Sequence, residues 1–373
     1  MNPRKGEPSH EDLSCGQGPR QVARADPGTD LVAVVPADLL TRRWKLATWL
    51  CAIAVLLALL FMAQYLTSPT EMVRIRNALL VVVTEPGDFD WTPSTVPASF
   101  VQERGPPDPY FVALAARLNL VAMESDWDRA IAISKHLLSH AALNGNMVQA
   151  NLRETEQRIT QNGDGYCGDF TRAFMALSLA AGMPVRAWAF SFDGYGGYGH
   201  ILPEIWNRQL SRWQLVDVFD NYYFHGKDGV AISATELRTA LAQPQRPIFR
   251  ALLSPQARPG HNFEDKAWDY FQRGLPQWYM VWGNNVFSYD RVGTKLGVDR
   301  LPRSLEQLVL IATGTYPPVK LLEVPGNRSD VMGLWQLRWM LFLAVIAGAT
   351  GSIGVVLCRR KWNQSERRAG EAN

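Results

Sequence analysis

The stretch Gly165-Tyr166-Cys167-Gly168-Asp169-Phe170 decides the fold, because it places a cysteine directly before a segment with helical periodicity. In that segment, Asp169 to Ala181 (DFTRAFMALSLAA), apolar side chains recur at the spacing of one helix face. Gly182 and Pro184 follow, and both are typical of a helix end, since glycine suits the position past the last turn and proline cannot continue the helix. Cys167 is therefore predicted to lie at or just before a helix N-terminus.

A helix N-terminus changes the chemistry of a cysteine. The unpaired backbone N–H groups and the positive end of the helix dipole favour a thiolate over a thiol. Gly165 and Gly168 leave room beside Cys167 for the backbone of a substrate. Most free cysteines are small buried apolar residues, but these neighbours favour a nucleophile.

Two apolar segments are long enough to cross a membrane. The first runs from about Leu46 to Leu66 without a charged residue, and the second from about Trp339 to Leu357. At 1.5 Å per residue, each spans a hydrocarbon core of ~30 Å. The polar stretch before the first segment is longer than a cleavable signal allows, so this segment is predicted to be an uncleaved anchor. Basic residues flank both segments: Arg42, Arg43, Lys45, Arg359, Arg360 and Lys361.

Basic residues beside a span resist translocation, so both chain ends are predicted to be cytoplasmic. The protein is then an integral protein of a plasma or inner membrane with its large domain outside the cytoplasm. The net charge of +3 is too small to indicate nucleic-acid binding. The predicted organisation is a disordered tail (1–43), a transmembrane helix (44–66), an extracytoplasmic domain (67–333, core about 160–222), a second transmembrane helix (335–358) and a cytoplasmic tail (359–373).

This layout isolates one cysteine. Of the four cysteines, Cys15 lies in the N-terminal tail, Cys51 lies inside the first apolar segment, and Cys358 lies at the inner end of the second. Exported domains usually use cysteines in pairs, as disulfides. Cys167 has no such partner on its side of the membrane, which again favours a chemical role.

After the predicted helix, three segments alternate as strands of an antiparallel meander do. His200 opens the second strand and Asp217 lies within the third. An imidazole can take the proton of a thiol, and a carboxylate can fix the tautomer of that imidazole, so Cys167 would complete a nucleophilic triad with these two residues. Asp220 is close enough in sequence to substitute for Asp217. The three strands are Val185–Phe192, Ile201–Trp206 and Arg212–Phe219.

Three sequence blocks in this order resemble the transglutaminase-like superfamily. They are the Cys167 helix with its glycine-methionine-proline end, His200 with Glu204 four residues on, and Trp213 with Asp217 four residues on. The resemblance covers about residues 160–222. It implies a papain-like cysteine fold with Cys167 as nucleophile, His200 as general base and Asp217 as the group that orients the base.

The resemblance implies an α+β fold in which the nucleophile helix packs on an antiparallel sheet. The family usually has an aromatic residue two positions after the histidine, where this chain has Leu202 followed by Pro203. Upstream segments with apolar helical faces are expected to form an N-terminal helical layer: Pro109–Glu124, Asp126–Leu143 and Met147–Gln161. The two transmembrane helices flank this core.

Such a site implies acyl transfer through a thioester on Cys167, with amide or peptide bonds of a protein or peptide in the cell envelope as substrate. Water as acceptor gives a protease or amidase, and an amine gives a protein-glutamine acyltransferase. No cofactor and no metal is expected. Two alternatives stay open: a cell-wall peptidase of another papain-like type, and a catalytically silent binding or scaffold domain in an envelope assembly.

Other patterns carry weaker predictions. The stretch Gly194–Gly199 matches G-x-G-x-x-G but leads into a strand, which disfavours a dinucleotide site and leaves a mobile loop or an ordinary hairpin connection. His136 and His140 have the spacing of metal ligands but lack a third ligand, so we expect surface or packing residues.

Three further patterns lie nearer the C-terminus. The aromatic run 268–287 is expected to pack in the core. The tripeptide Asn327-Arg328-Ser329 fits a glycosylation acceptor. Finally, the small residues Ala344, Gly348 and Ser352 predict close packing of the second apolar helix against a neighbouring helix.

Overall fold

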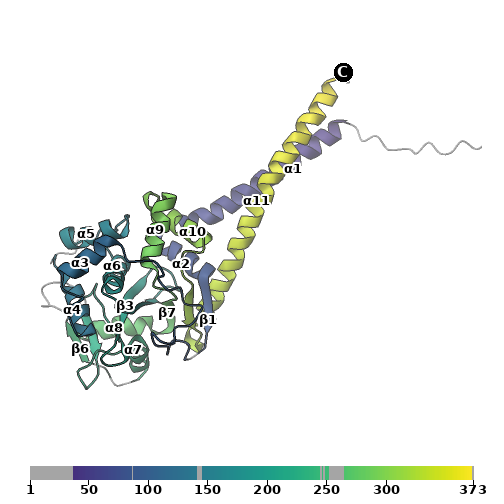
Figure 1. The fold of residues 1–373 in the computed structure, drawn as a ribbon. Coiled ribbons are helices and arrows are strands. Elements are labelled where there is room, and N and C mark those ends of the chain that lie inside the picture. Colours follow the sequence, from purple (N-terminus) through teal and green to yellow (C-terminus); the bar gives the residue numbers. More distant parts are fainter. Residues whose placement is uncertain are drawn as a thin grey trace, which may run out of the picture.

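The computed structural model describes residues 37–85, 87–140, 145–243, 246, 248–251 and 264–371. Two long helices, α1 (Ala37–Leu66) and α11 (Arg328–Glu371), leave a folded domain together (Figure 1). Their middle parts are apolar and largely exposed. This exposed apolar surface is the feature that suggests membrane anchoring. Residues 1–36 of the predicted tail, including Cys15, lie outside the described residues.

The two long helices pack against each other as an antiparallel pair. At the end far from the domain, the Thr41 hydroxyl donates to Ser365 Oγ over 3.0 Å. Nearer the domain, a Cβ added to Gly348 would lie 3.7 Å from Ala58. Helix α11 continues to Glu371, so the region predicted as a tail from 359 is helical for most of its length.

Small residues of α11 face α1, but the contact includes Gly351 in place of the expected Ser352. Gly351 is buried, and an added Cβ there would meet Val55 of α1 at 2.9 Å. Ser352 is exposed instead. A stripe spaced by four rotates slowly around a helix of 3.6 residues per turn, which explains why the contact passes from Gly348 to Gly351.

The first turns of α11 belong to the folded domain. Val331, Leu334 and Leu337 are buried in a core shared with helix α2 (Pro69–Leu80). The Arg338 guanidinium donates to the carbonyl oxygens of Ala78 and Leu79 at the end of α2, each over 2.6 Å. The exposed apolar stretch of α11 therefore begins after Arg338, inside the range predicted as the second span.

The predicted meander lies in a six-stranded sheet with the order β1-β8-β7-β2-β3-β4. All neighbouring pairs are antiparallel except β1 and β8, which are parallel. The prediction of a wholly antiparallel sheet is wrong at this edge. A parallel pair needs a long crossover, and most of the domain lies between these two short strands. The strands are β1 (Val81–Thr84), β2 (Val185–Ser191), β3 (Gly199–Asn207), β4 (Arg212–Leu215), β7 (Trp278–Val281) and β8 (Val319–Leu322).

Helix α6 (Cys167–Ala180) packs on β2 and β3, as predicted, with Phe170 and Phe174 buried in the main core. Helices α3 (Pro109–Arg117), α4 (Asp126–Leu137) and α5 (Leu152–Asn162) cover α6 from the other side. The first two of these end earlier than predicted. After α3 the chain turns at Asn119, which has a φ of 57°, a conformation that ends a helix.

A second, aromatic core lies on the face of the sheet opposite α6. Trp268, Phe271, Trp278 and Trp282 are buried together, which confirms that the aromatic run packs in the core. The remaining elements in the described part of the chain are β5 (Tyr222–His225), α7 (Ala234–Leu241), β6 (Ile248–Ala251), α8 (Glu264–Gly274), α9 (Val286–Leu296) and α10 (Arg303–Ala312), with short 3-10 turns at 275–277, 298–300 and 325–327.

A buried ion pair fixes β2 against β3. Arg186 Nε donates to Glu204 Oε2 over 2.5 Å, and both side chains are almost fully buried. The same carboxylate accepts from Trp188 Nε1 over 2.8 Å and from the backbone N–H of Ala234 over 2.7 Å. The guanidinium lies 3.9 Å from the ring centroid of Trp213. These contacts join β2, β3, β4 and α7 around the buried Arg186–Glu204 ion pair.

Candidate active site

The N-terminus of α6 is shaped by a glycine and an aspartate. Gly165 has a φ of 105°, which glycine adopts without strain. The Tyr166 N–H donates to Asp169 Oδ2 over 3.0 Å, which ties the residue before the helix to its first turn. Among the described residues, no acceptor pairs with the backbone N–H of Cys167 or Gly168. Two free donors therefore lie beside a partly buried thiol.

His200 lies near the start of β3, opposite Phe190 of β2. Gly199 precedes it, and a Cβ at that position would come within 2.0 Å of the Phe190 carbonyl oxygen, so only glycine fits. His200 Nε2 is 2.7 Å from Asp217 Oδ2, and each side chain is 2% exposed. The structure thus brings together the histidine and the aspartate selected from the sequence.

The sequence predicts Asp217 inside the third strand, but β4 ends at Leu215, so Asp217 lies outside it. Asp217 instead forms an isolated backbone pair with Tyr222 that closes a tight turn. Pro203 of β3 explains the change. Its carbonyl accepts from the Val216 N–H over 3.0 Å, but proline has no N–H to return, so the ladder between β3 and β4 stops here.

Asp220 is the second carboxylate near the imidazole. Its Oδ2 lies 3.6 Å from His200 Nε2, and its side chain is 12% exposed. Its backbone N–H donates to Asp217 Oδ1 over 3.1 Å, which holds the Asp217 carboxylate in place. Of the two aspartates, Asp217 is therefore the better partner of the imidazole, because its carboxylate is closer to His200 Nε2. His200, Asp217 and Asp220 could together ligate a cation, but the aspartates share the ring nitrogen that one hydrogen bond already uses.

The surroundings of His200 change its protonation. Burial by itself lowers the pKa of His200, but the charge of Asp217, with smaller effects of Tyr270 and of hydrogen bonds to Asp217 and Cys167, raises that pKa well above its ordinary value. The Cys167 side chain is thus close enough to the imidazole to contribute to this rise. A protonated imidazole beside the sulfur is the arrangement that stabilises a thiolate.

Tyr270 of α8 is a site residue that the sequence did not single out. Its ring centroid lies 5.7 Å from that of His200, and burial raises the pKa of its hydroxyl. Phe190 and Phe219 approach the imidazole from other elements at 5.8 and 6.2 Å. The aromatic run was visible in the sequence. Which of its side chains reaches His200 depends on how α8 packs against the sheet, and the sequence does not show this.

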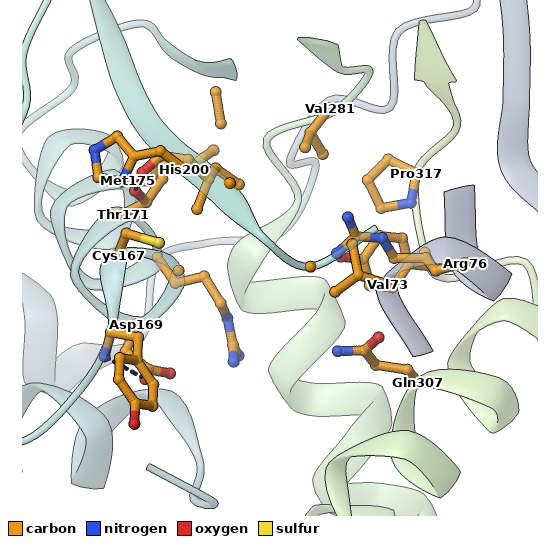
Figure 2. A pocket seen from close by; sticks show the side chains of 18 of the residues that line it. Val73, Arg76, Cys167, Asp169, Thr171, Met175, His200, Val281, Gln307 and Pro317 are labelled. Atoms are coloured by element: carbon orange, nitrogen blue, oxygen red, sulfur yellow. Dashed lines mark hydrogen bonds between the residues drawn. The ribbon is translucent and has the colours of Figure 1, made fainter. Parts of the chain in front are cut away.

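Cys167 and His200 open into a cavity of about 290 Å³. Figure 2 shows them on one wall, with Thr171 and Met175 of α6 nearby, while α2 and α10 form the facing wall with Arg76 and Gln307. A cavity of this size admits a side chain and a short length of backbone. The cleft therefore lies between the predicted core and the helix that follows α1.

The glycine loop from Gly194 to Gly199 is a hairpin connection fastened to α2. The Asn77 side chain donates to the Tyr195 carbonyl over 2.7 Å, and the Gly197 N–H donates to the Thr70 carbonyl over 2.9 Å. An added Cβ at Gly197 would lie 2.6 Å from Thr70 Cα, so glycine permits this close approach. The loop thereby links α2 directly to the start of the His200 strand.

Two other sequence patterns have structural roles. His136 Nε2 lies 2.6 Å from Glu156 Oε1 and joins α4 to α5, which agrees with a packing residue. Asn327 is fully buried, and its amide nitrogen donates to Pro276 O, Leu322 O and Tyr195 Oη. This burial overturns the expected glycosylation acceptor, because a glycan needs an exposed amide.

Comparison with protein families matches residues 113–218 to the transglutaminase-like superfamily. No curated protein and no solved structure matches the chain. The matched region begins earlier than the resemblance in the sequence suggested, since it includes α4, α5 and most of α3, and it ends directly after Asp217. Residues 113–218 are a transglutaminase-like superfamily domain, within a mixed α+β structure that also carries two long apolar helices.

Proposed function

We propose that the protein is a membrane-anchored cysteine acyltransferase or hydrolase that acts on amide or peptide bonds through Cys167, His200 and Asp217. The observation that carries this proposal is that Cys167 and His200 line one cavity while the His200 imidazole pairs with the Asp217 carboxylate. The three residue types match the roles of nucleophile, base and orienting group.

The first half-reaction would form a thioester. The Cys167 thiolate attacks the carbonyl carbon of the substrate, and the free N–H groups of Cys167 and Gly168 are available to bind the oxyanion. The carbon–nitrogen bond then breaks, and the imidazolium of His200 gives its proton to the departing amine. Because Nε2 of His200 pairs with Asp217, Nδ1 is the nitrogen that serves Cys167.

The second half-reaction would release the acyl group. Neutral His200 takes a proton from water or from an acceptor amine, whose oxygen or nitrogen attacks the thioester carbon. The carbon–sulfur bond breaks, and the Cys167 thiolate is restored. Asp217 keeps the imidazole in one orientation through both steps and stabilises its charged form.

The proposed location is a plasma or inner membrane, with the folded domain on the extracytoplasmic side and both chain ends in the cytoplasm. The basic clusters before the apolar part of α1 and after the apolar part of α11 support this topology, since they lie at the same end of the helix pair. A reporter fused after residue 373 should behave as cytoplasmic, and one fused near Ser94 as exported. A cytoplasmic signal from the Ser94 fusion would contradict the topology.

The experiment that tests the function is capture of the acyl group. Full-length protein in detergent is incubated with envelope extract, and Cys167 is then examined by peptide mass spectrometry. An acyl adduct on Cys167 that is absent in His200→Ala supports the proposal and also identifies the acyl donor. Cys51 and Cys358 in the same sample serve as reference cysteines.

Labelling by iodoacetamide at mildly acidic pH gives an independent measure, because ordinary thiols are mostly protonated there. Cys167 should react much faster than a free cysteine, and His200→Ala should slow it. If Cys167 labels no faster than a model thiol and His200→Ala changes nothing, the protein is better explained as a silent scaffold domain.

A further inference from the structure

Arg76 of α2 is a buried cation that lines the cavity opposite Cys167 (Figure 2). It is 8% exposed. Its guanidinium donates to the Asn77 side chain over 3.1 and 3.0 Å, to Tyr316 Oη over 2.9 Å and to Tyr279 Oη over 3.3 Å. All of these acceptors are neutral. A buried charge is costly unless an opposite charge accompanies it.

The other two arginines of the cavity do have such partners. Arg172 lies 3.9 Å from Asp290, and Arg303 lies 3.0 Å from Glu306. Among the described residues, no carboxylate lies within ion-pair distance of Arg76. The cavity therefore contains one positive charge that the folded chain, as far as it is described, leaves unbalanced.

The two tyrosines at Arg76 add further donors. Both hydroxyl oxygens accept from the guanidinium, so each hydroxyl hydrogen remains to donate elsewhere. Within the described part of the chain, neither hydroxyl has an acceptor for that hydrogen. Tyr279 and Tyr316 both line the cavity. One N–H of Arg76 Nη1 is likewise left over, so three donors surround the same part of the cleft.

We propose that Arg76, Tyr279 and Tyr316 bind a carboxylate of the substrate while its reacting carbonyl lies at Cys167. This proposal rests on the proposed function and narrows its substrate class to amides and peptides that carry a carboxylate close to the scissile bond. A carboxylate accepts up to four hydrogen bonds, which suits three converging donors. It also supplies the opposite charge that Arg76 lacks.

The test uses thiol-reactive probes in matched pairs. Iodoacetyl-glycine and iodoacetyl-β-alanine end in a carboxylate at two arm lengths, and their carboxamides are neutral counterparts of the same shape. Alkylation of Cys167 in the full-length protein is followed by peptide mass spectrometry. For at least one arm length, the carboxylate probe should react about tenfold faster than its carboxamide, a factor that corresponds to ~1.4 kcal/mol.

Arg76→Gln should reduce this ratio to about one while the rate of the carboxamide probe stays near that of the wild type. Tyr316→Phe, which removes one hydroxyl and keeps the ring, should reduce the ratio partly. Arg104→Gln removes the same charge from an exposed position outside the cavity and should leave the ratio unchanged. The carboxamide rate also reports whether each variant is folded.

The outcomes separate the two proposals. Equal rates for carboxylate and carboxamide probes at both arm lengths in the wild type, or a preference that survives in Arg76→Gln, overturn the carboxylate site and leave the catalytic proposal standing. If even the carboxamide probes label Cys167 no faster than a model thiol, the catalytic proposal fails instead.

Discussion

Replacing Glu204 with glutamine leaves Arg186 buried without the carboxylate that pairs with it. Glu204 accepts three hydrogen bonds, from Arg186, Trp188 and the Ala234 N–H. Glutamine keeps the size and one acceptor oxygen, so part of this network survives, but the charge of Arg186 loses its partner. Breaking a buried ion pair by removing one member typically costs ~3–5 kcal/mol, so we expect Glu204→Gln to lower the free energy of unfolding by about 3 kcal/mol.

Urea unfolding of the full-length protein in detergent measures this change. Trp91, Trp188 and Trp213 lie 4.8, 5.8 and 3.9 Å from the Arg186 guanidinium, so tryptophan fluorescence reports on this region directly. The midpoint should fall with little change in the slope. Because a domain is usually stable by ~5–15 kcal/mol, the loss should be easily resolved.

Two control variants test whether the lost stability comes from the buried ion pair. Glu323→Gln removes a carboxylate from the exposed pair with Arg328, which should cost less than ~1 kcal/mol. The double variant Arg186→Met with Glu204→Gln removes the unpaired charge and should recover much of the lost stability. If Glu204→Gln costs no more than Glu323→Gln, the buried pair does not stabilise the sheet as argued.

Asp217→Asn removes the main cause of the raised pKa of His200, so the alkaline limb of the pH profile for turnover should move to lower pH, whereas Asp220→Asn should move it much less. Measurement of kcat/KM between pH 5 and 10 tests this. An alkaline limb that does not move in Asp217→Asn would argue against the His200–Asp217 pair. The folded-state pKa of His200 is raised, so its contribution to stability is complete below pH ~6.5 and is lost as the pH rises through the raised value. The stability difference between wild type and Asp217→Asn should therefore shrink in alkali. Cys51 and Cys358 contact each other across α1 and α11, so mild copper-catalysed oxidation should join them within one chain; a product linked only between chains would contradict the helix pair.

The part of the site around Cys167 and His200 could be predicted, because it depends on patterns within a short stretch of sequence. The Cys167 helix and the three strands after it follow from periodicity and from the helix end at Gly182 and Pro184. The helix and the first two strands appear close to their expected ranges, and the third strand ends four residues early, at Leu215. The turn that holds Asp217 was missed because the effect of Pro203 appears only once β3 and β4 are aligned.

The facing wall of the cleft could not be predicted in this way. Arg76 comes from a helix far before Cys167, and Tyr316 from a loop far after it, so their meeting depends on the long-range packing of α2 and α10. The parallel pairing of β1 with β8 has the same origin, since each strand is only four residues long. Asn327 shows the reverse case, in which a local motif is overridden by burial.

The short connection between α1 and α2 limits how far the cleft can lie from the end of the first apolar helix. Helix α1 ends at Leu66, and α2 begins at Pro69. Roughly ten residues of chain join Leu66 to Arg76, which amounts to at most ~20 Å when helical residues rise 1.5 Å and extended ones ~3.5 Å. If the proposed topology and function hold, the cleft reaches substrates only within about that distance of the bilayer, so lipid-attached or membrane-proximal chains are within reach and more distant ones are not.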